Sequence, residues 1–304
     1  LAVWKQVTDV WCAGWFWDTA AGTPPSAGEF ADMAAFVRGQ RASLPAATVQ
    51  ARLTHVRRMA REHRFFHWTL EFPEVFYQDD GAPRRRAGFD AVVTNPPWEM
   101  MRADSGTSDQ RASGRAPTHA FLRFVRDSGL YAACDAGHAN LYQLFVERCL
   151  RLTKPGGRIG MIVPWGLASD HGSQALRQYL LQRCDTDTIV GFENTAGIFP
   201  IHRGVRFLLL STSPGTPTQA VRCHFGHRDP AVLDTLGGGS VPAGRAAGEG
   251  VTLSPAFLAR TSGTLAAFPY LRGERDQRLL ERLCHEHPAL GSPDGWGLSF
   301  GREL

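Results

Sequence analysis

The sequence predicts an α/β protein, in which a helical N-terminal segment precedes a mostly parallel sheet that ends in an antiparallel pair of strands. Two patterns along the 304 residues carry this prediction. Apolar residues recur every three or four positions over the first 70 residues, which is the spacing of one helix face. From residue 89 onward, short β-branched runs alternate with helical stripes, which is typical of a parallel sheet with crossover helices.

Three helices are expected in the N-terminal segment. Their apolar stripes consist of Trp4, Val7, Trp11 and Trp15, then Phe30, Met33, Ala34 and Val37, then Val49, Leu53, Val56 and Ala60. Ser26 is expected to cap the second helix, because a serine hydroxyl accepts a free N–H of the first turn. An aromatic-rich stretch at 65–76 ends the segment, and the Gly-, Pro- and Arg-rich stretch at 79–88 predicts a loop.

Four strands are expected downstream, at Phe89–Thr94, Ile159–Val163, Thr188–Phe192 and Val205–Leu210. Leucine-rich stripes at 141–152 and 176–180 predict helices that connect the first three strands, which are therefore expected to be parallel. The helix at 141–152 is expected to stop at Lys154-Pro155-Gly156-Gly157. No helix-length segment separates the last two strands, so these two are expected to pair antiparallel.

These patterns divide the chain into three regions. Residues 1–78 form the helical, aromatic-rich segment, residues 79–213 contain the predicted sheet, and residues 214–304 are expected to be a linker and the start of a C-terminal region. The linker is placed around Gly237-Gly238-Gly239, because glycine runs favour flexible backbone. The first residue is Leu1 rather than Met, so the chain is expected to be joined to the remainder of a larger polypeptide.

Composition excludes several classes of protein. Hydrophobic residues make up 43% and charged residues 20%, which excludes an intrinsically disordered chain. No apolar run approaches the roughly 18 residues of a membrane span, so no membrane partner is expected. The six cysteines include no C-x-x-C pair, which favours reduced thiols in the cytoplasm over a zinc site or a disulfide framework. No metal is expected, and the net charge of +4 agrees with a nucleic-acid partner without deciding for one.

The sharpest chemical signal is Asn95-Pro96-Pro97-Trp98, directly after the strand expected at Phe89–Thr94. Ligands of open α/β sheets bind at the carboxyl ends of strands. Pro96 keeps Asn95 extended and neither proline has an N–H, so a rigid corner would present the Asn95 amide oxygen and the Pro96 carbonyl. Two such acceptors can hold both hydrogens of an exocyclic amine and make its nitrogen more nucleophilic. A turn that merely ends the strand is the alternative.

Asn95-Pro96-Pro97-Trp98 resembles the catalytic motif of amino-methylating DNA methyltransferases. Its flanks, Phe66-His67-Trp68, residues 71–76 and Gly88-Phe89-Asp90, are similar to those of the large adenine-specific methylases. That family comprises the type IIG restriction–modification enzymes and the BREX phage-defence methyltransferases. Residues 142–152, 156–164 and 198–210 resemble its next helix, strand and loop. The resemblance implies that the chain holds the C-terminal part of a Rossmann-like methyltransferase domain, and that 214–304 begins a target-recognition region.

The resemblance also implies an activity: transfer of a methyl group from S-adenosylmethionine to the N6 amino group of an adenine flipped out of double-stranded DNA. Asn95, Pro96, Pro97 and Trp98 would be the catalytic residues, and Trp98 would stack on the adenine. Phe199 would contact the second face of the adenine; a buried hydrophobic anchor is the alternative for this residue.

One departure from the family concerns the cofactor. The family holds S-adenosylmethionine with a glycine-rich loop of the D-P-x-x-G-S-G kind after its first strand, and this sequence has no such loop. Gly156-Gly157 follows a helix and precedes a strand, which is the reverse of the required order. The cofactor-binding residues are therefore expected upstream of Leu1, and the chain alone is expected to be inactive.

Two other functions stay open at this stage. Methylation of a protein glutamine uses the same chemistry, because a side-chain amide also carries two hydrogens. A Trp at the fourth motif position and the long helical segment argue against it, since glutamine methylases tend to have Tyr there and to be compact. A non-catalytic DNA-binding fragment of a methyltransferase is the third function, and the missing glycine-rich loop favours it.

Overall fold

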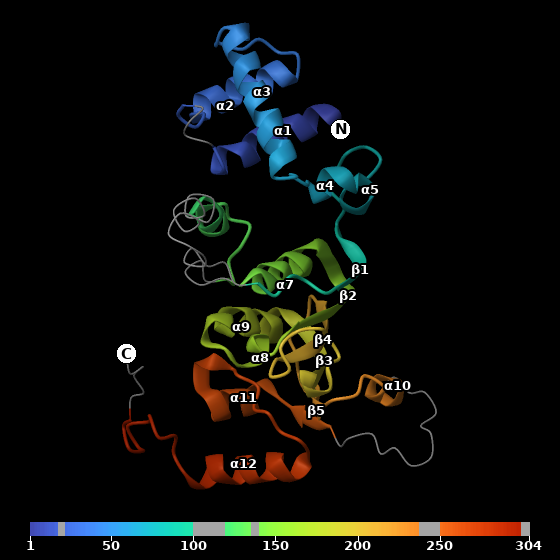
Figure 1. The fold of residues 1–304 in the computed structure, drawn as a ribbon, viewed down its shortest axis with the longest axis vertical. Coiled ribbons are helices and arrows are strands. Elements are labelled where there is room, and N and C mark those ends of the chain that lie inside the picture. Colours follow the sequence, from blue (N-terminus) through green and yellow to red (C-terminus); the bar gives the residue numbers. More distant parts are fainter. Residues whose placement is uncertain (18–21, 100–118, 135–139, 237–249, 299–304) are drawn as a thin grey trace. The chain divides into compact units, whose positions relative to one another are not determined.

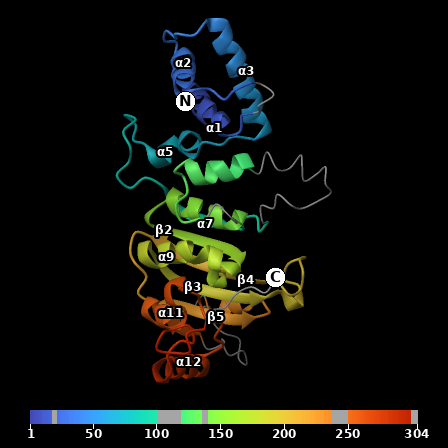
Figure 2. The ribbon, with the colours of Figure 1, turned by 90° about the vertical axis from the view of Figure 1, so that its left-hand side faces the viewer.

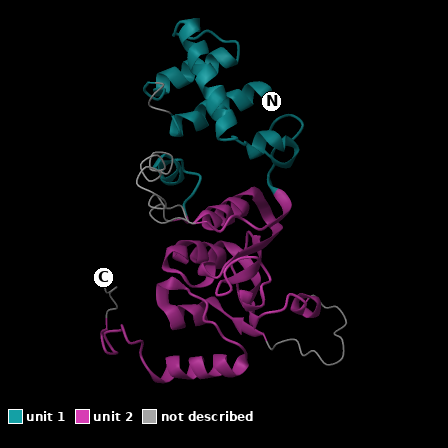
Figure 3. Cartoon of the chain, in the orientation of Figure 1, with its two compact units in different colours: residues 1–88, 101–132 teal, residues 89–100, 133–304 magenta. Residues whose placement is uncertain are grey.

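The chain folds into two compact units (Figure 3). The computed structural model describes residues 1–17, 22–99, 119–134, 140–236 and 250–298. One unit comprises Leu1–Gly88 and Met101–Ala132, and its described elements are helices apart from one isolated bridge between Tyr77 and Pro83. The other comprises Phe89–Met100 and Ala133–Leu304 and contains the sheet. The expected linker at Gly237-Gly238-Gly239 lies outside the described residues.

The helical unit confirms the three expected helices. They are α1 (Ala2–Trp15), α2 (Ala27–Val37) and α3 (Ala46–Glu62), followed by the short α4 (Trp68–Glu71) and α5 (Pro73–Phe76) (Figure 1). The Ser26 hydroxyl accepts the Glu29 N–H at 3.3 Å, and the Glu29 carboxylate accepts the Ser26 N–H at 2.9 Å. The predicted cap is therefore a reciprocal capping box, which satisfies two N–H groups at the start of α2.

The apolar face of α1 differs from the predicted stripe. Val10 and Ala13 are the buried residues of this helix, whereas Trp4 and Trp11 are exposed. Val10 and Ala13 pack in a cluster with Met33 of α2 and with Val49, Leu53, Val56 and Met59 of α3. Small residues sit at the centre of α1 because the three helices approach one another there, and the large indoles lie at the margin.

The described sheet has six strands in the order β1-β2-β4-β3-β5-β6. Their bounds are β1 (Phe89–Thr94), β2 (Thr153–Pro164), β3 (Cys184–Glu193), β4 (Arg206–Pro214), β5 (Val221–His227) and β6 (Val251–Leu253). β1, β2, β3 and β5 run in one direction, and β4 and β6 run in the other. This mixed sheet confirms the expected Rossmann-like α/β class. β3 and β4 pair antiparallel as expected, but they do not end the sheet, because β5 and β6 follow them in the sequence and continue it beyond β3.

Side chains alternate between two apolar clusters on the two faces of the sheet. On one face, Leu208 and Leu210 of β4 pack with α7 (Leu141–Leu152), α8 (Gly166–Ser169), α9 (Gln174–Arg183) and α11 (Pro255–Ser262). Figure 2 shows α7, α9 and α11 beside the sheet. On the other face, Phe207 and Leu209 pack with the loop that contains Phe199 and with α10 (Val232–Leu236). The last described helix is α12 (Glu274–Glu286).

β2 begins earlier than predicted. Its first residue is Thr153, directly after α7, so Lys154-Pro155-Gly156-Gly157 lies inside the strand. The pairing with β1 skips from Phe89↔Thr153 to Ala91↔Arg158, and this irregularity accommodates the extra residues. A Cβ at Gly157 would come within 2.9 Å of the Phe89 carbonyl oxygen, so the close approach of the two strands requires glycine there.

The region boundaries expected from the sequence also differ from the structure. The helical unit extends to Gly88, ten residues beyond the expected boundary at 78. β5 and β6, which lie within the expected linker and C-terminal region at 214–304, pair into the same sheet as β3. Sheet pairing of residues far apart in the sequence overrides a boundary drawn from a local loss of pattern.

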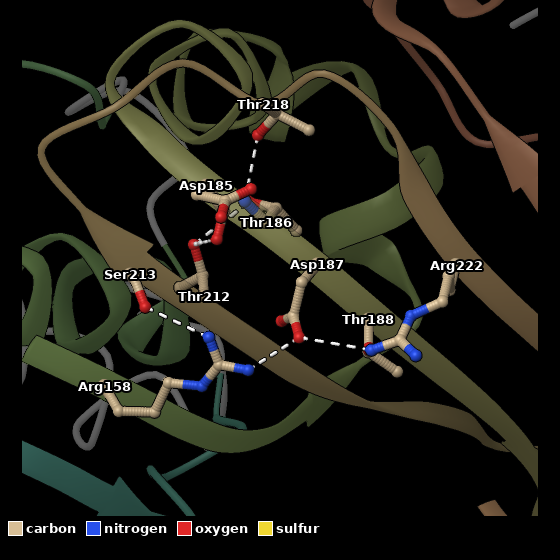
Figure 4. A network of polar contacts seen from close by, with 9 residues as sticks. All are labelled: Arg158, Asp185, Thr186, Asp187, Thr188, Thr212, Ser213, Thr218 and Arg222. Atoms are coloured by element: carbon tan, nitrogen blue, oxygen red, sulfur yellow. Dashed lines mark hydrogen bonds and ion pairs between the residues drawn. The ribbon is translucent and has the colours of Figure 1, made fainter. Parts of the chain in front are cut away.

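A polar network joins four strands towards the amino ends of the parallel strands (Figure 4). Arg158 of β2 donates to Asp187 of β3 at 2.6 Å and to Ser213 of β4 at 3.1 Å. Arg222 of β5 lies 3.5 Å from the same Asp187 carboxylate. These contacts join the strands at the end of the sheet where the parallel strands begin. None of the helices in the described ranges has the length and apolar character needed to cross a membrane.

Candidate active site at the carboxyl edge of the sheet

Asn95-Pro96-Pro97-Trp98 follows β1 at the sheet edge where the four parallel strands end. β1 ends at Thr94, which pairs with Met161 of β2. Asn95 is exposed, Pro96 is buried and Trp98 is half-buried. The predicted corner therefore turns its asparagine to solvent and anchors its first proline and its indole in the protein.

The corner is connected directly to α7. The Glu99 carbonyl, one residue beyond the motif, accepts the Leu141 N–H at 3.0 Å. Leu141 is the first residue of α7, and Asn140 and Gln143 form a capping box at that helix start. Because α7 packs in the main core, this bond restrains the motif at its C-terminal side, while β1 restrains it at its N-terminal side.

Two acceptors in the corner are available. Within the described part of the chain, neither the Asn95 amide oxygen nor the Pro96 carbonyl accepts a hydrogen bond. Both prolines lack an N–H, so the backbone around Asn95 offers acceptors rather than donors. The corner is thus chemically suited to a ligand that brings two hydrogens, such as an amine.

Trp98 lies between both apolar clusters of the sheet unit. Its ring centroid is 6.0 Å from that of Phe199, with the planes at 77°, and 5.9 Å from that of Phe207. The indole N–H is buried and finds no acceptor among the described residues. Packing against both clusters fixes the orientation of the indole ring. A fixed ring orientation is what a surface for stacking requires.

The fold places Phe199 in contact with Trp98, as expected if both residues belong to one site. The two rings are in edge-to-face contact, so no base fits between them in this arrangement. Phe199 also packs on Phe207, at 5.0 Å between centroids. Phe199 thus packs against both the indole and Phe207 in this structure, and its contact with adenine stays a prediction.

Asn194 is a positioning residue that sequence reasoning missed. It is fully buried directly after β3, and its Nδ2 donates to the carbonyl oxygens of Phe199 at 3.1 Å and Ile201 at 3.2 Å. Its Oδ1 accepts the Phe199 N–H at 2.9 Å. Asn194 thereby holds the loop that carries Phe199. An asparagine at a strand end is the signal that could have revealed it.

All six cysteines are free, and burial raises the pKa of Cys12 and of Cys184 to about 12, so neither thiol is ionised near neutral pH. No group of three or more His, Cys, Asp or Glu side chains in the described ranges is placed to hold a metal ion.

The glycines do not form a cofactor loop of the expected kind. Gly156 and Gly157 lie inside β2, and the described strand-to-helix turns contain at most one glycine each. The described residues therefore do not fit a glycine-rich loop for S-adenosylmethionine.

A model of the Eco57I restriction-modification methylase family matches residues 38–199, which is more than half of the chain. The chain belongs to this family. The matched range includes α3 and the Asn95-Pro96-Pro97-Trp98 corner, and it ends at Phe199, within the loop between β3 and β4. No curated protein is significantly similar to the chain.

Solved structures are similar to this family member at low sequence identity. The type I restriction enzyme EcoKI M protein is 15% identical, with a TM-score of 0.41 over 66% of this chain and 48% of that one. The type IIG restriction endonuclease BpuSI is 18% identical, with a TM-score of 0.38 over 66% of this chain and 22% of that one. A type I methyltransferase subunit from Streptococcus thermophilus is 16% identical, with a TM-score of 0.34 over 51% and 32%. The chain spans less than half the length of each.

Proposed function

We propose that this protein transfers a methyl group from S-adenosylmethionine to the N6 amino group of adenine in double-stranded DNA, in the cytoplasm, as part of a restriction–modification system that defends against phage. The observation that carries the proposal is the exposed Asn95 beside the Pro96 carbonyl, two acceptors without partners among the described residues, in a chain that belongs to a methylase family.

In the proposed mechanism, the Asn95 amide oxygen and the Pro96 carbonyl each accept one hydrogen of the adenine amine. This draws the nitrogen lone pair out of conjugation with the ring and directs it at the methyl group. Pro97 keeps the corner rigid, because its ring restricts the backbone. No general base with a shifted pKa is required to activate the amine, since orientation and electrostatics supply the effect. When the nitrogen takes the methyl group, it releases one of its two hydrogens as a proton to solvent, and the cofactor would leave as S-adenosylhomocysteine.

Trp98 binds the flipped base in this proposal. A base stacked on an aromatic ring gains roughly 1–3 kcal/mol, which offsets much of the few kcal/mol needed to extrude it from the duplex. Phe199 and Phe207 hold the indole from the other sides. Direct contact of Phe199 with the adenine would require the two rings to separate.

S-adenosylmethionine supplies an electrophilic methyl group when bound. Because the described residues do not fit a glycine-rich loop, we expect this chain by itself to bind the cofactor weakly and to be inactive. Calorimetric titration of the chain with S-adenosylmethionine should therefore show no binding in the micromolar range. Micromolar binding would contradict this expectation and would place a complete cofactor site within these 304 residues.

The choice of acceptor tests the proposed function. The intact protein is incubated with S-adenosylmethionine labelled in the methyl group, and with either duplex DNA or a protein that exposes glutamine. We expect label in DNA only, because Trp98 offers a stacking surface that a glutamine amide does not need. Label in the protein alone would favour the glutamine methyltransferase, and no label with retained DNA binding would favour a non-catalytic DNA-binding protein.

A further inference from the structure

A second group of side chains gathers at the same edge of the sheet. Glu193 ends β3, Arg206 begins β4, and Arg228 directly follows β5. Tyr270 and Arg272 come from the chain segment after α11. We refer to these five residues as the Glu193 cluster; none of them takes part in the mechanism proposed above.

Glu193 is buried and both of its oxygens are engaged. Oε2 accepts from Nε and lies 2.8 Å from Nη2 of Arg228, while Oε1 accepts from the Tyr270 hydroxyl at 2.9 Å and lies 3.7 Å from Arg272. The hydrogen bond from Arg228 is the main reason that the pKa of Glu193 lies below its usual value. The carboxylate therefore orients arginine side chains from two different segments.

Arg206 contacts the cluster through the aromatic ring of Tyr270. It is the β4 residue opposite Glu193, and its guanidinium lies 4.7 Å from the centroid of the Tyr270 ring. Three guanidinium groups thus surround one carboxylate. Two carboxylates lie nearby: Asp229 follows Arg228 and accepts the Ala231 N–H, and Asp276 lies in the first turn of α12 and accepts the Arg272 N–H.

A bulge in β5 produces this arrangement. Val190 pairs with His224, but Phe192 pairs with His227, so β5 contains one extra residue. Gly226 lies in the bulge with a φ of +85°, a conformation that other residues rarely adopt. Without the extra residue, His227 would lie opposite Glu193 in the pairing of β5 with β3. With the extra residue, Arg228 lies opposite Glu193.

The arginines remain accessible although they are oriented. Arg228 keeps 62% and Arg272 keeps 68% of the side chain exposed, and Arg206 is also exposed. Exposed guanidinium groups whose positions are already restrained bind phosphate with a smaller loss of conformational entropy. We propose that the Glu193 cluster binds the phosphodiester backbone of the DNA substrate through Arg206, Arg228 and Arg272.

The position of the cluster agrees with one continuous DNA ligand. Along the sheet order, β4 is two strands and β5 four strands from β1. At about 4.8 Å between strands, Arg206 and Arg228 lie roughly 10 and 19 Å from the Asn95 corner, measured across the strands. That is roughly three to six nucleotides at 3.4 Å per nucleotide. The inference rests on the proposed function, because it takes DNA as the ligand.

Arg222 provides a matched control for Arg228. Both are exposed arginines associated with β5, each pairs with one carboxylate on β3, and they lie at opposite ends of the strand. Binding of the intact protein to a short labelled DNA duplex, without cofactor, is measured at several salt concentrations. We expect Arg228→Gln to weaken binding about tenfold and to lower the salt dependence by about one phosphate contact, whereas Arg222→Gln changes neither.

A second background separates phosphate binding from a purely structural role. Arg228→Gln in the native protein leaves a buried carboxylate with one partner fewer, and this alone could distort the edge. In a Glu193→Gln protein no such charge exists, and we expect Arg228→Gln to weaken DNA binding there by the same factor. If the loss disappears in that background, or if both arginine variants bind DNA like the unmodified protein, the inference is wrong.

These outcomes are distinct from failure of the proposed function. DNA binding that depends on Arg228 in a protein that methylates no adenine would contradict the proposed function alone. DNA binding that is insensitive to Arg228 would contradict this inference alone. An intact protein without any affinity for DNA would contradict both.

Discussion

Asn194 shows how much of the site depends on one buried side chain. Replacing it by alanine removes the donor for the Phe199 and Ile201 carbonyls and the acceptor for the Phe199 N–H. We expect Asn194→Ala to lower the free energy of unfolding by about 1–3 kcal/mol, because buried polar groups lose their partners. Urea denaturation measures this, and Thr195→Ala, at the exposed next position, should change it little. Equal values for the two variants would contradict the assigned role.

The ionisation of Glu193 predicts how stability depends on pH. Its pKa is lower in the folded protein than the ordinary value of 4.5, chiefly because Arg228 donates a hydrogen bond to the carboxylate. The ionised form therefore stabilises the fold above about pH 4.5, and this contribution is lost as pH falls through the folded pKa. Glu193→Gln lacks this titration, so its free energy of unfolding should fall less steeply than that of the native protein between about pH 5 and pH 3. Parallel curves in urea denaturation across this range would contradict the ion pair.

At the scale of elements, Gly191 determines how β3 packs against its neighbours. A Cβ at this position would lie 2.9 Å from Cδ1 of Phe225 and 3.0 Å from Cζ3 of Trp165. We expect Gly191→Ala to destabilise the sheet unit by about 1–3 kcal/mol, because the rings must shift. Gly14→Ala is the control: nothing lies within 4 Å of a Cβ there, and alanine should stabilise α1 by about 0.5–1 kcal/mol. Thermal unfolding that shows the same sign for both variants would contradict this packing.

Elements with strong local signals were predictable from the sequence. β1 and α7 lie where an apolar run and a leucine-rich stripe indicate them, because prolines end the first and an asparagine cap begins the second. β5 was missed, because its polar positions Arg222, His224 and His227 interrupt the apolar run. β6 has only three residues and is a strand because it pairs with β5. Such strands are determined by tertiary pairing rather than by propensity.

The same distinction applies to the candidate site. The corner at Asn95 could be predicted, since its four residues are contiguous and the prolines restrict the backbone locally. The contact of Trp98 with Phe199 was suggested only by family resemblance. The Glu193 cluster could not be predicted, because the pairing of Glu193 with Arg228 requires the register of β3 against β5 and the bulge at Gly226.

At the scale of the whole molecule, residues beyond 213 are integral to the sheet unit. β5 pairs along β3, and Val221, Cys223 and Phe225 of β5 are buried in its core. A chain truncated after Ser213 should therefore lose cooperative unfolding, because the edge of β3 and its apolar cluster would be exposed to solvent. A chain truncated after Glu286, the end of α12, should retain cooperative unfolding by circular dichroism. Cooperative unfolding of the chain truncated after Ser213 would contradict this and would support a domain boundary near residue 213.

The most direct test of the central claim is the methylated nucleoside that the intact protein makes with and without Asn95. Duplex DNA is incubated with S-adenosylmethionine, digested, and analysed by nucleoside mass spectrometry, and DNA affinity is measured in parallel. The account predicts N6-methyladenine from the native protein and a loss of about 100- to 1,000-fold or more in Asn95→Ala, with DNA affinity unchanged. N6-methyladenine formed by Asn95→Ala at the native rate would contradict it.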